Sequence, residues 1–263
     1  MNSETGESST LVVGSRSDLE SVGRIPELLE IDKEIGRPVI AEPLVYNSQT
    51  WSRLLELPWI IRQLGPLGSL SVLDVGSGVS ALPIYLARHG AKVISIDPEV
   101  PPGLPAGVTR VRAALPHLPF RDTTFDVVCC VSVIEHLPFD VDLSYSELTR
   151  VARNRIIITF DVAKSPLAVF GLSRVELKAL ARAVGKGLVF PEDRLKPSIA
   201  ERKVWIVQTA VCLLEAIRTD RGWPAIHLSA GERRRIRFHR WIQDVLMFVR
   251  NRMLKLRRRL TGK

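Results

Sequence analysis

The chain has 263 residues, 46% of them hydrophobic, which is enough to bury the core of one large domain. Its three cysteines lack the spacing of a metal site or a disulfide framework, and no apolar run reaches the ~18 residues that span a membrane. The N-terminus also lacks the basic and then apolar order of a signal peptide, so we expect a cytoplasmic protein with reduced thiols. The net charge of +9 comes from the C-terminal end of the sequence, because residues 231–263 contain ten Arg, two Lys and two acids. Charge placed in this way says nothing about what the main body binds.

Composition divides the chain into three parts. Residues 1–22 are rich in Ser, Gly and Glu, which predicts a disordered N-terminus. Residues 23–228 contain the regular elements of one domain, and residues 229–263 form a basic tail.

The main part alternates between predicted strands and helices. A first helix is expected over residues 51–64, where apolar side chains recur at helical spacing around Pro58. The following strands are expected at residues 71–75, 92–96, 109–112, 125–133 and 155–160, and the helices at 81–90, 143–152 and 174–184. Ser173 and Glu176 form a capping box for the last of these helices, and the apolar residues 200–218 predict one more long helix. The alternation predicts an α/β fold, a Rossmann-like doubly wound, mostly parallel sheet flanked by helices, with extra N- and C-terminal helices.

A glycine-rich turn joins the first of these strands to its helix, in the sequence VLDVGSGVSALP. Glycines at positions 76 and 78 let a ligand approach the backbone, as in the loops that bind NAD or S-adenosylmethionine (SAM). An ordinary tight turn would look the same. Asp74 favours SAM, because a carboxylate repels a pyrophosphate and attracts the ammonium and sulfonium groups of SAM.

Asp97 ends the second strand of the alternation, about 20 residues after the glycines. A carboxylate there can accept hydrogen bonds from the two hydroxyls of a ribose, although it could also cap a turn. Asp97 therefore supports an adenosyl ligand without choosing between the two cofactors.

A third segment, LPFRDTTFDVVCCVSVIEHLP, begins at Leu118 and ends at Pro138. Together with VLDVGSG and ISIDPE, in this order and at this spacing, it resembles the class I SAM-dependent methyltransferase superfamily. The resemblance covers residues 71–160, roughly a third of the chain, and it implies a Rossmann-like fold with SAM as the cofactor.

The resemblance also implies roles for single residues. The methionine part of SAM would be lined by Asp74, Gly76, Ser77 and Gly78. Asp97 would hold the ribose, Pro98 would lie beside the adenine, and Ser132 would belong to the floor of the site. The family commonly has an acid four residues before the Leu-Pro-Phe segment, where this chain has Ala114. The adenine contact is then expected from backbone groups of Ala114 and Leu115, or it is missing.

Glu135 and His136 follow the strand where the site is expected. Methyl transfer from SAM depends chiefly on alignment, and a general base is needed only when the acceptor atom carries a proton. An unperturbed histidine titrates near neutrality, which makes His136 the candidate catalytic residue and favours an oxygen acceptor. Alternatively, His136 holds the loop or positions the substrate. Cys129 and Cys130 could be nucleophiles, but their apolar strand favours a structural role.

Apolar residues of the basic tail recur three or four apart, which predicts one stripe on a helix. They are Ile236, Phe238, Trp241, Ile242, Val245, Phe248, Val249, Met253, Leu256 and Leu260. Three interpretations stay open: a helix docked on the domain with a solvated basic face, a helix on an anionic membrane surface, and a contact with nucleic-acid phosphates, of which the last is the least favoured.

These patterns predict a SAM-dependent methyltransferase that acts on a small or lipid-linked metabolite, with peripheral membrane contact through the tail as a further expectation. An RNA or protein methyltransferase recruited by the tail, and a SAM-binding protein without turnover, remain as alternatives. The acceptor is not named by the sequence, because we expect its site in the segments 25–65 and 163–230.

Overall fold

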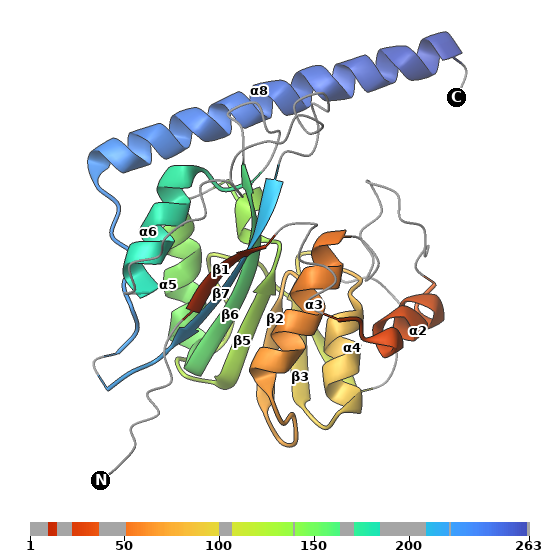
Figure 1. The fold of residues 1–263 in the computed structure, drawn as a ribbon, viewed down its shortest axis with the longest axis vertical. Coiled ribbons are helices and arrows are strands. Elements are labelled where there is room, and N and C mark those ends of the chain that lie inside the picture. The colour runs from red at the N-terminus through yellow and green to blue at the C-terminus, as the bar shows by residue number, and fades with distance from the viewer. Residues whose placement is uncertain are drawn as a thin grey trace.

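The computed structural model describes residues 10–14, 23–36, 51–99, 107–138, 140–163, 171–184, 209–220 and 222–261 (Figure 1). The strands are β1 (Thr10–Gly14), β2 (Ser71–Val75), β3 (Lys92–Asp97), β4 (Val108–Arg112), β5 (Phe125–Val131), β6 (Ala152–Ala163) and β7 (Thr209–Ile217). The helices are α2 (Pro26–Glu34), α3 (Trp51–Leu64), α4 (Ala81–Arg88), the 3₁₀ turn η2 (Ile134–His136), α5 (Val141–Val151), α6 (Arg174–Val184) and α8 (Ala230–Thr261).

The described strands form one seven-stranded sheet in the order β1-β7-β6-β5-β2-β3-β4. Five adjacent strands, β6, β5, β2, β3 and β4, run parallel to one another. Strand β7 runs antiparallel to both of its neighbours, β6 and β1. The chain leaves β2 toward β3 and β4 and then returns to the other side of β2 as β5. This reversal opens a crevice at the carboxyl ends of β2 and β5, which is where open α/β sheets bind ligands.

Helices cover both faces of the sheet (Figure 1). Helices α2, α3 and α4 share one buried cluster with the sheet, and α5 and α6 share the other. Strand β5 contributes to both, because Val127 and Cys129 point into the first cluster and Val128 and Cys130 into the second. The predicted mostly parallel, doubly wound sheet flanked by helices is therefore confirmed.

Several predicted elements have the expected bounds. Helices α3 and α6 begin and end where the patterns place them. The capping box is formed as expected: the Ser173 amide donates to Glu176 Oε2 at 2.9 Å, and the Glu176 amide donates to Ser173 Oγ at 3.4 Å. Gly90 follows α4 at a φ of +95°, the left-handed conformation that ends a helix.

The helix predicted for residues 200–218 is wrong where the structure describes it. Residues 209–217 form strand β7, and residues 200–208 lie outside the described part. The five residues 212–216 are all buried, because β7 is paired on both sides and covered on both faces. A short apolar run of this kind carries no periodicity that separates a buried strand from a buried helix.

The predicted disorder of residues 1–22 is wrong for one segment. Residues 10–14 form strand β1, which pairs with β7 from Thr10 opposite Glu215 to Gly14 opposite Val211. The pairing supplies backbone hydrogen bonds that composition does not reveal. The other residues of 1–22 lie outside the described part.

Helix α8 docks on the domain through its first turns (Figure 1). Arg233 forms ion pairs with Asp140 and Asp142 near the start of α5, at 2.8 and 2.6 Å. Arg240 donates to the carbonyl of Leu137 and to Glu176, the latter at 2.6 Å. Across the described residues, no helix combines the length and the apolarity needed to cross a bilayer.

Candidate functional site

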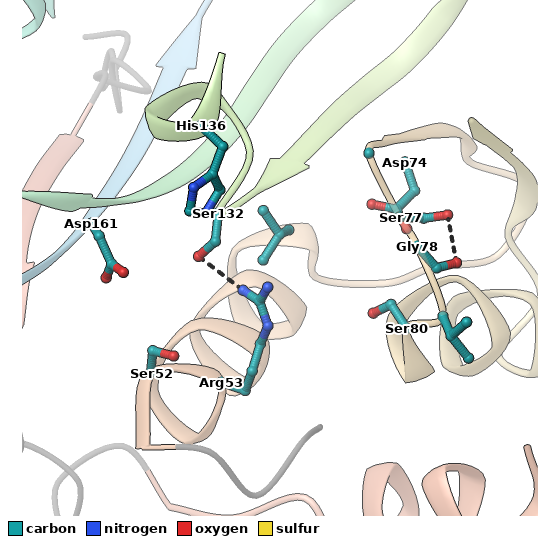
Figure 2. A pocket seen from close by; sticks show the side chains of 12 residues that line it. Ser52, Arg53, Asp74, Ser77, Gly78, Ser80, Ser132, His136 and Asp161 are labelled. Carbon is teal, nitrogen blue, oxygen red and sulfur yellow. Dashed lines mark hydrogen bonds between the residues drawn. The ribbon is translucent and has the colours of Figure 1, made fainter. Parts of the chain in front are cut away.

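A cavity of about 290 Å³ opens at the carboxyl ends of β2 and β5, and we call it the β2–β5 cavity. It is lined by Ser52, Arg53, Asp74, Gly76, Ser77, Gly78, Val79, Ser80, Val131, Ser132, His136 and Asp161. Figure 2 shows the glycine loop on one side and the side chains from α3, β6 and the segment after β5 on the other. Six of the ten residues that the sequence singled out, from Asp74 to His136, therefore meet in one place.

The backbone of the glycine loop has a conformation and a close contact that a residue with a side chain would not fit. Gly76 has a φ of +69°, and a Cβ atom there would lie 2.5 Å from a methyl carbon of Val133. The amides of Gly76 and Ser77 both donate to the carbonyl of Ile96, which fastens the loop to the end of β3. The loop is thus held close to the neighbouring strand and leaves room on its other side.

Asp97, the last residue of β3, is hydrogen-bonded to the glycine loop. Its Oδ2 accepts a hydrogen bond of 2.8 Å from the Gly78 amide, and its Oδ1 accepts one of 2.9 Å from the Glu99 amide. On the other side, Arg110 Nη1 donates to the Gly78 carbonyl at 3.0 Å. A carboxylate can accept about four hydrogen bonds, so Asp97 keeps acceptor capacity for a ribose.

The structure does not bring four of the expected cofactor residues to the β2–β5 cavity as the described residues line it. Asp97 and Pro98 lie at the end of β3 and just beyond it, and Pro98 is exposed. Ala114 is exposed, whereas the side chain of Leu115 belongs to the hydrophobic core. The roles expected of these residues toward ribose and adenine stay predictions.

Asp74 is a buried acid with an unused oxygen. It is 2% exposed, and its Oδ2 has no hydrogen-bond partner among the described residues. Burial raises the pKa of Asp74 to about 7, and the positive charges of Arg110 and Arg53 oppose this rise. A bound cation would restore the solvation that this carboxylate has lost.

Arg53 and Glu56 connect α3 to the sheet beneath the cavity. Arg53 Nη1 donates to Glu56 Oε2 at 2.5 Å and to Ser132 Oγ at 3.0 Å (Figure 2). The hydroxyls of Ser132 and Thr159 both donate to Glu56 Oε1 at 2.6 Å. Glu56 is fully buried, and the paired carboxylate helps to keep the pKa of Arg53 raised against the effect of its own burial.

Two buried acids, Glu135 and Asp161, lie beside this ion pair. The Asp161 amide donates to Glu135 Oε1 at 3.0 Å, while Glu135 Oε2 and Asp161 Oδ1 have no partner among the described residues. Burial, reinforced by the charge of Asp161, raises the pKa of Glu135 well above its usual range. Burial likewise raises the pKa of Asp161 to about 7, with Glu56 adding to the effect. Burial thus favours the protonated form of Glu135, which can donate a hydrogen bond.

His136 lines the cavity as the last residue of turn η2, which follows β5. Its backbone amide donates to the Val133 carbonyl at 3.0 Å, and the residue is exposed. Partial desolvation of the ring, with the charge of Arg53 as a second cause, lowers the pKa of His136. The imidazole is therefore neutral, and able to accept a proton, at neutral pH.

The adjacent cysteines do not belong to the site. Cys129 and Cys130 are fully buried, and burial raises the pKa of both thiols. Neither forms the thiolate that nucleophilic attack requires, which supports their interpretation as small hydrophobic residues.

The residues of the cavity fit the methionine end of SAM. Asp74 Oδ2 can accept a hydrogen bond from an ammonium group, and the Arg53 guanidinium can pair with a carboxylate. Sequence reasoning missed Arg53, Glu56, Arg110 and Asp161, since none lies in a recognised motif. The one available signal was the pair Arg53 and Glu56, two opposite charges three residues apart in the largely apolar first half of α3.

Comparison with known proteins agrees with this site. Residues 73–158 match the family described as "Methyltransferase domain". The ubiquinone biosynthesis O-methyltransferase of Xylella fastidiosa (strain 9a5c) is 30% identical over 153 residues, which are 54% of this chain and 60% of that protein. The enzyme of the same name from Xanthomonas axonopodis pv. citri (strain 306) is 29% identical over 162 residues, covering 58% and 66%. The chain thus spans less than two thirds of the length of these relatives.

Among solved structures, the YcgJ protein of Bacillus subtilis is 16% identical with a TM-score of 0.45, covering 62% of this chain and 98% of that one. The magnesium protoporphyrin IX methyltransferase of Synechocystis PCC 6803 is 21% identical with a TM-score of 0.38, covering 62% and 80%. The domain match contains the end of β2, the glycine loop and the segment through His136. Residues 73–158 of the chain thus resemble a methyltransferase domain, as the motifs of the sequence predict.

Proposed function

We propose that the protein transfers a methyl group from SAM to an oxygen atom of a small or lipid-linked metabolite. The superfamily supports methyl transfer, and the names of the two curated relatives support an oxygen acceptor. The observation that carries the proposal is that His136 lines two cavities at once.

The second of these cavities, the α8 cavity, lies between η2 and helix α8. Its volume is about 260 Å³, and it is lined by Glu135, His136, Leu137, Pro138, Arg240, Gln243, Asp244 and Met247. His136 therefore stands between the expected methionine end of SAM and a space large enough for part of an acceptor. We assign the acceptor to the α8 cavity.

The residues of the site would have separate roles in binding SAM and in accepting a proton. SAM, when bound, supplies an activated methyl group, so the protein mainly aligns the acceptor. Asp74 and Arg53 would hold the methionine end, and Asp97 the ribose. His136 would take the proton from the acceptor hydroxyl on a ring nitrogen. Glu135 is the poorer candidate for this role, because burial raises its pKa and favours its protonated form.

A third cavity is the main alternative location for the acceptor. This α2–α3 cavity has a volume of about 180 Å³ and shares Arg53 with the β2–β5 cavity. It is lined by Arg24, Ile25, Pro26, Leu28, Leu29, Arg53, Leu54 and Pro58. No acid or histidine is among these residues, so this cavity offers no base to an acceptor hydroxyl.

Filling each cavity tests the assignment. Met247→Trp, in the α8 cavity, is expected to lower methyl transfer at least about tenfold, because it displaces the acceptor without touching the glycine loop. Leu29→Trp, in the α2–α3 cavity, is the matched control and should leave transfer unchanged. Transfer is measured with labelled SAM on lipid, small-molecule, RNA and protein fractions. Label found only in RNA or protein would reject the proposed acceptor class, and the opposite ranking of the two variants would move the acceptor to the α2–α3 cavity.

Asp97→Ala is expected to raise the dissociation constant of SAM about tenfold to a hundredfold, since each hydrogen bond to a charged group contributes about 1.5–3 kcal/mol. The substitution removes the proposed ribose acceptor and also releases the Gly78 amide. Calorimetric titration with SAM measures the effect, and Glu99→Gln, at an exposed position two residues after Asp97, serves as the control. An unchanged dissociation constant would remove Asp97 from the cofactor site.

A further inference from the structure

Helix α8 has two faces of opposite character. The docked face contains Arg233, Ile236, Arg240 and Gln243, which pair with or pack against the domain. The apolar face contains Phe238, Trp241, Val245, Phe248, Val249 and Met253, which are 63%, 60%, 42%, 64%, 42% and 62% exposed. Phe238 follows Ile236 by two residues, or about 200° around a helix, so the apolar face points away from the domain.

This arrangement differs from a helix that docks through its apolar stripe and leaves a basic face in water. Apart from Ile236, the docked face holds the domain through polar groups: Arg233 and Arg240 bind acids, and Gln243 donates to the Gly171 carbonyl at 2.8 Å. Six large apolar side chains in one exposed row are more than a monomer normally leaves in water, which indicates a binding surface.

Positive charge surrounds the same face. Arg234, Arg235, Arg237 and Arg252 are exposed, and no ion pair joins them to an acid in the described part of the chain. Arg234 and Arg235 also form a shallow hollow with Phe238 and Gly231. Of the two acids in the tail, Glu232 is held by Arg182, so the tail presents an excess of free cations beside its aromatic side chains.

We propose that the apolar face of α8 lies on an anionic membrane surface. Apolar and aromatic side chains would enter the boundary between headgroups and acyl chains, and the arginines would pair with lipid phosphates. A second copy of this chain is a poorer occupant, because two such tails would bring like charges together. Nucleic acid is also poorer, since its phosphates would meet the apolar side chains.

The proposal goes beyond methyl transfer and does not depend on it. It has a consequence for the proposed acceptor, however, because α8 also forms one wall of the α8 cavity through Arg240, Gln243 and Met247. A helix is about 10–12 Å across with its side chains. A lipid-linked acceptor in the membrane would therefore need to move only about one helix diameter to reach His136.

Co-sedimentation of the full chain with vesicles tests the membrane contact without measuring activity. Vesicles of phosphatidylcholine mixed with phosphatidylglycerol are expected to bind the protein, and added salt should weaken binding. The triple variant Phe238→Ser, Trp241→Ser, Phe248→Ser should bind at least about tenfold more weakly, because three apolar side chains no longer enter the lipid. Its thermal midpoint should stay near that of the parent, since all three side chains are exposed.

Leu143→Ser supplies the matched control, because Leu143 is an apolar side chain on α5 that is 51% exposed outside the tail. It should bind vesicles as the parent does. Equal binding by the triple variant and the parent, or equal binding to vesicles with and without phosphatidylglycerol, would overturn the proposal. A parent chain that sediments as a dimer and a triple variant that sediments as a monomer would assign the face to a second copy instead.

Discussion

Replacing His136 by glutamine is expected to lower turnover about 10²-fold while SAM binds as before. Glutamine keeps a polar side chain of similar reach but cannot take up a proton at neutral pH. The loss would appear in kcat, because the proposed proton transfer accompanies the chemical step. Single-turnover transfer of labelled methyl, together with calorimetric titration of SAM, separates the two effects. Unchanged turnover would reduce His136 to a residue that shapes the cavity.

The pH dependence of the same reaction gives a second readout. The lowered pKa of His136 places the midpoint of its titration below 6.5, the ordinary value for histidine. The pKa of Asp74 is about 7, so the measurement is made at saturating SAM to remove its effect on SAM binding. We therefore expect kcat to decline as the pH falls, with a midpoint below 6.5. The His136→Gln variant should lose this decline, since no proton is taken up at position 136. A decline of the same midpoint in both proteins would assign it to another group.

Replacing Glu56 by leucine is expected to destabilise the protein by about 3–5 kcal/mol, the usual cost of removing one partner from a buried ion pair. Glu56 accepts hydrogen bonds from Arg53, Ser132 and Thr159. The leucine variant would leave the largely buried guanidinium of Arg53, which is 17% exposed, without its carboxylate. Urea denaturation followed by circular dichroism measures the difference in the free energy of unfolding.

Two further variants make this measurement specific. Glu30→Gln breaks the exposed pair of Glu30 with Lys33 on α2 and should leave stability nearly unchanged. The double variant Arg53→Met, Glu56→Leu removes both buried charges and should recover much of the lost stability. If the single Glu56 variant is as stable as the parent, the ion pair does not hold α3 to the sheet.

The elements that could be predicted from the sequence are those with a local cause. The glycines at 76 and 78, the capping box of Ser173 and Glu176, and the helical spacing of residues 51–64 each act within a few residues. Strand β7 could not be predicted in the same way, because its conformation depends on pairing with β6 and with the distant β1. The orientation of α8 could not be predicted either. The apolar pattern does not reveal that α8 contacts the domain mainly through polar side chains such as Arg240 and Gln243.

The same distinction applies to the site. Asp74 lies near the carboxyl end of β2, and Ser132 and His136 follow β5, so their convergence follows from the parallel sheet. Arg53 reaches the cavity from a helix that precedes the sheet in the chain, and only the packing of α3 over β5 and β6 brings it there. Contacts formed by such packing have no signature in the spacing of residues.

Strand β1 has a consequence for how the chain can be shortened. Residues 10–14 cover the outer edge of β7, which would otherwise present a row of unpaired amides and carbonyls. An edge of this kind pairs readily with a strand of another molecule. A gene trimmed to begin after Gly14, as if the first residues were dispensable, would encode a protein prone to self-association through β7. Strand β1 replaces this edge with a shorter one, of five residues against nine in β7, which leaves fewer unpaired backbone groups for another molecule.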